Sequence, residues 1–141
     1  MSTLVKIIIF FVLSHTVLNA QELKGQDIIV KIDNLDNNKG KVYVALYNSQ
    51  DTFLDKGYKA SFTYIENNSC EVVFKNVPNG IYAISMFHDE NGNNRLDSNF
   101  LGIPKEDYGC SNNARGFMGP PKWKDAKFEL HNKSVTKTIT L

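Results

Sequence analysis

The sequence predicts an all-β fold in which two sheets pack face to face as a β-sandwich. Three observations predict it. Apolar and polar residues alternate in several short segments, Asn, Gly and Pro separate these segments, and none carries a helical apolar stripe of convincing length. Alternation places every second side chain on the same face of a strand. Two sheets that are each apolar on one face bury those faces against each other.

Seven segments show the alternation, and each is expected to be one strand of an antiparallel seven-stranded sandwich. In chain order they are residues 28–32, 42–46, 58–64, 70–74, 82–86, 126–130 and 135–141. Short antiparallel strands separated by turns are typical of an immunoglobulin-like or transthyretin-like topology. In the third segment, the expected inward face carries Tyr58, Ala60, Phe62 and Tyr64.

Two features place the fifth segment. Residues 77–80 form a turn, because Pro78 presets φ and the following Asn79 and Gly80 tolerate the conformations that a turn needs. We expect this turn to join the fourth and fifth strands as a hairpin. The fifth segment is apolar on both faces, which predicts a central and covered position.

The first 20 residues differ from the rest of the chain. Lys6 precedes an unbroken apolar run at 7–13, and Ala20 offers a small residue for cleavage. We therefore expect a secretory signal peptide at 1–20, a single domain at 21–141, and a secreted or periplasmic protein. No other segment is apolar enough to span a membrane.

The charge of the chain argues against a nucleic-acid partner. The whole chain has 16 basic and 15 acidic residues, so the charge is balanced once Lys6 is removed with the leader. Nucleic-acid binding proteins carry a basic patch or stripe that neutralises phosphates. No such stripe is present, and we expect no nucleic-acid partner.

A long segment, residues 89–125, separates the fifth and sixth expected strands and shows no sustained alternation. Structureless segments of this length are uncommon in compact domains and are usually functional or packed on themselves. This one carries several large apolar residues and several Gly and Pro residues; the apolar ones include Phe100, Ile103, Tyr108, Phe117, Met118 and Trp123. We expect one long ordered loop here, and we look for the functional site in it.

Oxygen-bearing side chains alternate at the start of this loop, in the spacing of an EF-hand-like calcium loop. The predicted Ca²⁺ ligands are Asp89, Asn91, Asn93, the backbone carbonyl of Arg95, and Asp97. The acidic ligand of the twelfth position is missing, because Phe100 stands there, so the site would be weak. The same composition also fits a loop whose side chains cap its own backbone in Asx-turns, and both interpretations stay open.

The same long loop carries a second candidate site, for an organic ligand. Its residues are Tyr108, Asn112, Asn113, Arg115 and Trp123. Aromatic rings beside polar groups suit the recognition of a sugar or a peptide, so the expected partner is a cell-surface glycan or protein. The alternative is that the rings are buried and hold the loop against the sandwich.

His88 is the candidate for chemistry. It would centre a small hydrolase or a metal-dependent enzyme, but it has no histidine or cysteine partner at metal-binding spacing. The alternative is a histidine at a strand end that bonds to nearby backbone or carboxylate groups. We expect a non-enzymatic binding or structural module.

Two cysteines, Cys70 and Cys110, offer one disulfide. An exported protein meets an oxidising compartment, where such a bridge is stable. The alternative is that the two residues are unrelated and small, each packed in the core.

Several motifs in a fixed order resemble one family. They are GKVYVALYNS at 40–49, VPNGIYA at 77–83, HDENGN at 88–93, LGIPKE at 101–106 and SNNA at 111–114. Together they resemble the exported bacterial family called domain of unknown function 2141, over about 27–141. The resemblance implies an all-β exported protein and assigns no activity. Cys110 departs from the family pattern, which has an aromatic residue there, so the resemblance does not imply a disulfide.

Overall fold

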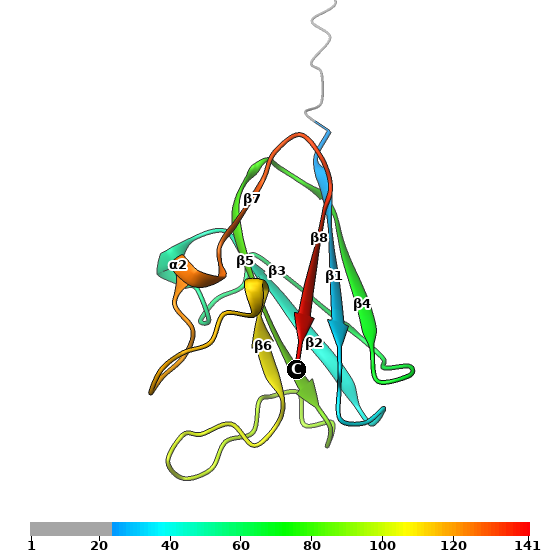
Figure 1. Ribbon diagram of the computed structural model, residues 1–141, viewed down its shortest axis with the longest axis vertical. Helices are drawn as coiled ribbons and strands as arrows, with labels where there is room; N and C mark the ends of the chain where they lie inside the picture. Colours follow the sequence, from blue (N-terminus) through cyan, green and yellow to red (C-terminus); the bar gives the residue numbers. More distant parts are fainter. Residues whose placement is uncertain (1–23) are drawn as a thin grey trace, which may run out of the picture.

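The computed structural model describes residues 24–141, and the predicted signal peptide at 1–20 lies outside the described residues. The described residues form eight strands (Figure 1): β1 (Gln26–Asp33), β2 (Lys41–Tyr47), β3 (Lys59–Thr63), β4 (Cys70–Val77), β5 (Gly80–Asp89), β6 (Tyr108–Cys110), β7 (Phe128–Leu130) and β8 (Val135–Thr140). Three short helical turns accompany them: η1 (Gln50–Thr52), η2 (Ser111–Asn113) and α2 (Trp123–Ala126).

The strands form two sheets, so the all-β prediction is confirmed. One sheet has the order β4-β1-β8, and the other has the order β3-β2-β5-β6, with β7 also paired to β5. β5 therefore has the central position that its two apolar faces predicted. The pairing of β1 with β8 is parallel, while the other pairs are antiparallel.

The expected count of seven antiparallel strands is wrong in two respects. The eighth strand, β6, has three residues and is too short to show alternation. The parallel pairing of β1 and β8 could not be read from the sequence, because alternation identifies the faces of a strand but not its partner or direction.

The turn at 77–80 is present, but the expected hairpin is wrong. β4 belongs to the first sheet and β5 to the second, so this turn carries the chain from one sheet to the other. A turn that begins with Pro favours type I or II geometry, which splays the flanking strands instead of pairing them. The phenol of Tyr82 donates to the carbonyl of Pro78 at 2.8 Å and fixes the corner.

The core lies between the two sheets and contains the expected inward residues of four strands. All are at most 5 % exposed: Ile28, Val30 and Ile32; Val42, Val44 and Leu46; Val72 and Phe74; Tyr82, Ile84 and Met86. Burial of this apolar area at roughly 25 cal/mol per Å² is the main term that stabilises the fold.

The third strand faces the other way from the prediction. Phe62, on the edge strand β3, is 50 % exposed, and Tyr64, just after this strand, is 68 % exposed. Their rings are part of an aromatic row on the outer face, where the centroids of Tyr43 and Phe62 lie 5.8 Å apart. The ammonium of Lys41 lies 4.9 Å from the centroid of the Phe62 ring. Cross-strand aromatic and cation–π contacts thus hold these rings at the surface.

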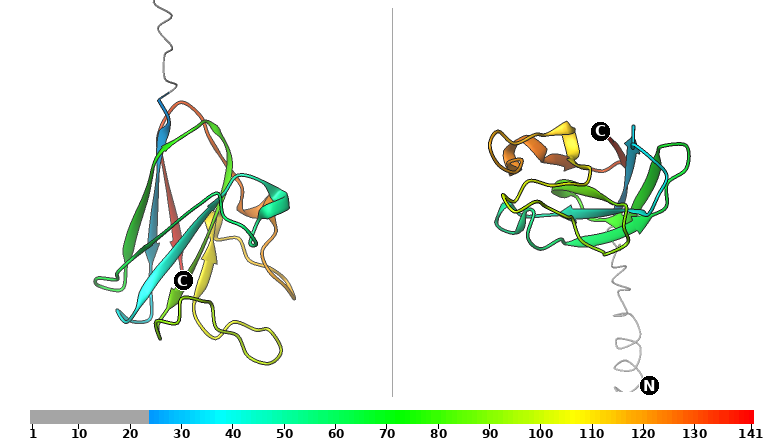
Figure 2. Two further views of the ribbon diagram at one scale, coloured as in Figure 1. Left: turned by 180° about the vertical axis from the view of Figure 1, so that it is seen from behind. Right: turned by 90° about the horizontal axis from the view of Figure 1, so that it is seen from below.

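The long segment after β5 is ordered by local elements. It contains the first loop (residues 90–107), then β6 and η2, then the second loop (residues 114–122) and α2. The two loops project from the same side of the molecule in the views of Figures 1 and 2. The buried hydroxyl of Ser111 accepts from the backbone N–H of Ile84 at 2.9 Å and donates to the carbonyl of Ala126 at 2.6 Å. This hydroxyl joins the long segment to the central strand.

Replacing Ser111 by alanine is expected to lower the free energy of unfolding by about 1 to 3 kcal/mol, because a buried N–H and a buried carbonyl each lose a partner. Urea denaturation monitored by circular dichroism measures the loss. Ser98→Ala is the matched control, since Ser98 is exposed in the first loop. Equal stability of the two variants would contradict the role of the hydroxyl.

Candidate functional site

The first loop is built on the carboxylate of Asp89, which is fully buried. Its Oδ1 accepts from the backbone N–H groups of Gly92 at 2.9 Å and Asn93 at 3.1 Å. Its Oδ2 accepts from the N–H of Asn94 at 2.9 Å. Three backbone donors thus satisfy a buried charge that would otherwise be costly, and they fix the path of the chain.

The middle of the loop is closed by Asp97. Its Oδ2 accepts from the side-chain amide of Asn91 at 2.6 Å, and its Oδ1 accepts from that of Asn93 at 2.8 Å. Hydrogen bonds from Asn93 and then Asn91 hold the pKa of the Asp97 carboxyl below its usual value. The Nε of Arg95 lies 3.4 Å from Oδ1 of Asp97, and its side chain is otherwise exposed.

Glu106 connects the two ends of the first loop. Its Oε1 accepts from the backbone N–H of Glu90 at 3.1 Å, and its Oε2 accepts from that of Asp97 at 3.0 Å. The backbone of Lys105 donates to the carbonyl of Asp97 at 2.8 Å. The start and the end of the loop are therefore tied together by one carboxylate.

The structure brings the predicted calcium ligands into one loop, but it pairs them with one another. The described residues contain no group of three His, Cys, Asp or Glu side chains arranged to hold a metal ion. Asp89 faces backbone donors, and Asp97 faces the amide nitrogens of Asn91 and Asn93. A cation would require both amides to turn so that their oxygens face it. The geometry fits the Asx-turn alternative, and the calcium site stays a prediction.

A second feature is a groove of about 940 Å³ on the outer face of the larger sheet. Both loops border it. Its lining comes from the sheet (Tyr43, Val44, Ala45, Tyr47, Ala60, Ser85, Met86, Phe87, Tyr108, Gly109 and Cys110), from the first loop (Leu96, Leu101, Gly102, Ile103 and Pro104), from the second loop (Gly116, Met118, Gly119, Pro120 and Pro121), and from Leu54.

Aromatic rings form the floor of this groove. The rings of Tyr43 and Phe87 stack with centroids 5.1 Å apart and planes 13° apart. The phenol of Tyr43 donates to Oδ1 of Asn94, which ties the floor to the first loop. The hydroxyls of Tyr47 and Ser85 lie 3.1 Å apart and bond to each other. Most hydroxyls of the floor are therefore already partnered inside the protein.

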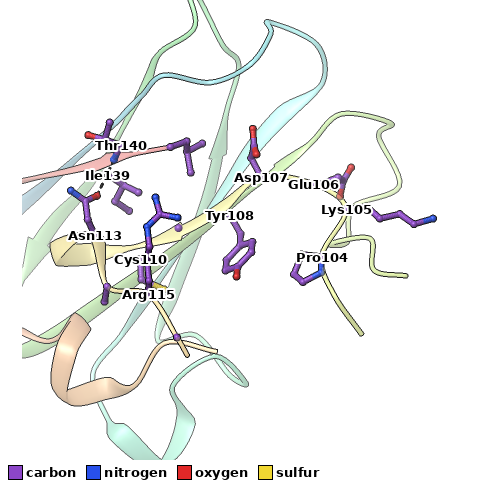
Figure 3. A pocket seen from close by; sticks show the side chains of 14 residues that line it. Pro104, Lys105, Glu106, Asp107, Tyr108, Cys110, Asn113, Arg115, Ile139 and Thr140 are labelled. Atoms are coloured by element: carbon purple, nitrogen blue, oxygen red, sulfur yellow. Dashed lines mark hydrogen bonds between the residues drawn. The ribbon is translucent and has the colours of Figure 1, made fainter. Parts of the chain in front are cut away.

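A smaller cavity of about 360 Å³ lies on the other side of β6, beside β8 (Figure 3). Its lining includes Lys105, Asp107, Asn113 and Arg115. The side-chain oxygen of Asn113 accepts from the backbone N–H of Thr140 at 3.0 Å. Burial, followed by the nearby charge of Asp36, raises the pKa of the Asp107 carboxyl.

The structure brings three of the five predicted organic-ligand residues to one place, since Tyr108, Asn113 and Arg115 all line the smaller cavity. Tyr108 lines the groove and is 44 % exposed. Trp123 is half-buried and packs edge to face with Phe53, with centroids 5.7 Å apart. The amide of Asn112 donates to the backbone carbonyls of Asp125 and Lys127.

Asn113 and Arg115, the remaining two predicted residues, line the smaller cavity together with Tyr108. The structure thus favours the alternative that Trp123 holds the loop, and it leaves Tyr108 as the one predicted residue at the groove.

His88 is fully buried at the end of β5 and lines neither the groove nor the smaller cavity. Its Nε2 lies 2.6 Å from the carbonyl oxygen of Lys39, and its Nδ1 has no hydrogen-bond partner among the described residues. Because the ring is buried and bonds to a backbone carbonyl, this geometry fits the structural alternative for His88.

The predicted disulfide is not formed. Cys70 and Cys110 are both free thiols in the described part of the chain. Cys70 lies on β4 and packs against the main core, whereas Cys110 lies on β6 in a separate small cluster with Ala83 and Ala126. The two residues stand on different sheets, and burial raises the pKa of each thiol to about 11.

The comparison with known families bears on all of these features. Residues 30–138 match the family described as "uncharacterized protein conserved in bacteria (DUF2141)". The chain belongs to this family. The match confirms the resemblance seen in the motifs, and it spans both loops and the whole lining of the groove. No curated protein and no solved structure matches the chain.

For this DUF2141 chain, sequence reasoning missed the groove. The signal was present in β2, where the outward positions Tyr43, Ala45 and Tyr47 carry no charged or amide side chain. A strand that is apolar on both faces has its second face covered by protein or available to a ligand. The described residues include no helix that is long and apolar enough to cross a membrane.

Asp89→Asn is expected to lower the free energy of unfolding by about 1 to 3 kcal/mol, because an amide nitrogen would face a backbone N–H that now has an acceptor. Chemical denaturation measures the difference. Asp55→Asn is the control, since Asp55 is exposed on the turn after η1. If both variants unfold at the wild-type midpoint, the carboxylate does not organise the loop.

Proposed function

We propose that this DUF2141 protein is a non-enzymatic binding module of the periplasm or cell exterior, and that its groove takes an elongated apolar ligand. One observation carries the proposal: none of the 22 residues that line the groove has a charged or amide side chain. A volume of about 940 Å³ lies at the upper end of the range of small-molecule sites.

The polar groups of the groove argue for an apolar ligand over a sugar. Its hydrogen-bonding side chains are Tyr43, Tyr47, Ser85, Tyr108 and Cys110. The first is bonded to Asn94, and the next two are bonded to each other. The hydroxyls of a sugar would lose their hydrogen bonds to water and form few hydrogen bonds to the groove. Each hydroxyl left without a partner would make the free energy of binding less favourable. The backbone of a peptide would meet the same shortage.

The walls of the groove expose apolar surface to water. Leu101 is 68 % exposed and Ile103 is 56 % exposed, both on the first loop. A ligand that covers such side chains gains roughly 25 cal/mol for each Å² of apolar area removed from water. The gain depends on area and not on direction, which suits a ligand with few polar groups.

The chemistry of the groove supports binding without catalysis. Cys110 and Ser85 are nucleophile types that line it. Burial raises the pKa of the Cys110 thiol to about 11, so the thiol stays protonated and unreactive at neutral pH. Ser85 is bonded to Tyr47, and no general base stands beside either residue in the lining. Export follows from the predicted leader.

Ala45→Phe is expected to weaken binding of the apolar probe N-phenyl-1-naphthylamine at least about tenfold, because a ring would fill part of the floor. Probe fluorescence titration measures the affinity. The control is Val73→Phe, which adds a ring at an exposed site on β4 of the other sheet. Equal affinity of both variants, or no probe binding by the wild type, would refute the apolar groove.

A finer proposal concerns the first loop, where a weakly bound Ca²⁺ would hold Asp89, Asn91, Asn93, the carbonyl of Arg95, and Asp97. The spacing of these residues supports it. Because the Tyr43 phenol is bonded to Asn94, a Ca²⁺ that orders the first loop would also order the Tyr43 ring in the groove floor.

With the affinity of extracellular modules, about 10⁻⁴ to 10⁻³ M, roughly 10 mM Ca²⁺ is expected to raise the free energy of unfolding by about 1.4 to 2.7 kcal/mol. Thermal unfolding in Ca²⁺, in Mg²⁺ and in EDTA measures the shift, and Asp97→Asn should abolish it. Identical curves in the three solutions would leave the self-capped loop as the correct description.

A further inference from the structure

The two loops end in large apolar side chains that the fold does not use. Phe100 is 95 % exposed and Leu101 is 68 % exposed at the tip of the first loop. Phe117 and Met118 are each 93 % exposed at the tip of the second loop. Side chains this exposed contribute almost nothing to the core, and groups of them on one face mark an interaction surface.

The first tip is a closed turn that holds its apex outward. The side-chain oxygen of Asn99 accepts from the backbone N–H groups of Leu101 at 2.9 Å and Ile103 at 3.0 Å. The backbone N–H of Asn99 donates to the carbonyl of Ile103 at 2.8 Å. Gly102 has the left-handed φ of 77° that the turn requires. Phe100 therefore stands at the apex of an ordered turn.

The second tip is equally tight. A Cβ on Gly116 would lie 1.7 Å from the carbonyl oxygen of Gly119, so the two ends of this turn nearly touch. Met118, between them, has a left-handed φ of 53°. The apex of a tight turn usually carries Gly, Asn, Asp or Ser. Large apolar side chains at both apices, Phe100 at the first and Phe117 with Met118 at the second, are unfavourable in water and indicate that something covers them.

The two tips form one surface. Leu101 and Met118 border the same groove, and the loops project from the same side of the molecule (Figures 1 and 2). The acidic residues Asp97, Glu106 and Asp107 of the first loop are half-buried, and the first two are bonded to the loop itself. Four exposed basic residues lie on the two loops: Arg95, Lys105, Arg115 and Lys122. The one exposed acidic residue of these loops, Glu90, lies at the root of the first loop, where its carboxylate accepts from the side-chain amide of Asn37.

We propose that these two tips dock the protein on the surface of an anionic lipid bilayer. The four apolar side chains insert among the headgroups, and the four basic side chains lie near the lipid phosphates. A protein partner would need a continuous complementary face of standard interface size. Two separate apolar wedges with basic neighbours fit a soft, negatively charged surface better. This docking goes beyond the groove and does not require it to be filled.

The test is co-sedimentation of residues 21–141 with lipid vesicles. This span leaves out the predicted leader, whose apolar run would itself bind lipid, and it contains every strand pairing of the described fold. Vesicles that contain phosphatidylglycerol are compared with vesicles of phosphatidylcholine alone. We expect binding to the anionic vesicles, weakened by salt because exposed charges are screened.

Phe100→Ser combined with Phe117→Ser is expected to reduce binding at least about tenfold, since the inserted apolar area is lost. The control is Phe62→Ser combined with Tyr64→Ser, which removes two exposed aromatic rings at the opposite edge of the sheet. Arg115→Gln and Lys122→Gln should each weaken binding to the anionic vesicles about fivefold. Ala45→Phe should bind vesicles like the wild type, which separates docking from the groove.

A second measurement reports insertion directly. Phe117→Trp places a fluorophore on the tip, and the one natural tryptophan, Trp123, is half-buried against Phe53. A blue shift of the new emission on anionic vesicles supports docking. The proposal is overturned if no shift occurs, if the vesicles are not bound, or if the control pair lowers binding as much as the tip pair. Loss of binding in the charge variants alone would also overturn it.

Discussion

The hydroxyl of Ser111 is the contact on which the arrangement of the whole loop side depends. The segment from Asp89 to β7 has one strand of three residues and two single helical turns, so little regular hydrogen bonding fixes it. Ser111 supplies what is missing, because it bonds to Ile84 on the central strand and to Ala126 at the end of α2. Both borders of the groove take their position from this point.

A second polar contact acts at the other end of the same segment. The carboxylate of Asp89 is buried where β5 ends, and it turns the chain through three backbone donors. A buried polar group is costly unless it is fully hydrogen-bonded. The Ser111 hydroxyl and the Asp89 carboxylate therefore favour the one backbone conformation that gives them all their partners. The conformation of the first loop is thereby fixed where the loop begins. The fold does not use the side chains at its tip, so they are available for contacts with other molecules.

The sequence predicted the inward face of each strand that packs one side against the core, because burial determines which positions are apolar there. The inward faces of β1, β2, β4 and β5 follow from alternation alone, because these strands place one side against the core. The prediction was wrong for the third segment, where Phe62 and Tyr64 look like core residues. Phe62 lies on the outer face of the edge strand β3, and Tyr64 is exposed just after it. Aromatic rings suit either face of a strand, and only the pairing partners decide between them.

The candidate sites divide in the same way. The Asp89 loop could be predicted because its residues are close together in the sequence, and their spacing is typical of such a loop. The organic-ligand set was not, because Asn112 and Asn113 cap backbone groups of distant segments. The groove combines β2, β5 and two loops, and no local pattern indicates that these segments meet. The local signs of it were the outer face of β2 and the second apolar face of β5.

The parallel pairing of β1 with β8 has a mechanical consequence. The pairing runs from Ile28 with Val135 to Asp33 with Thr140, so the first and last strands lie side by side and point the same way. Force applied through Gln26 and Thr140 would pull these strands past each other along their length. All the hydrogen bonds between them would then bear the load together, in shear, instead of opening one after another. A domain connected in this way resists stretching along the chain.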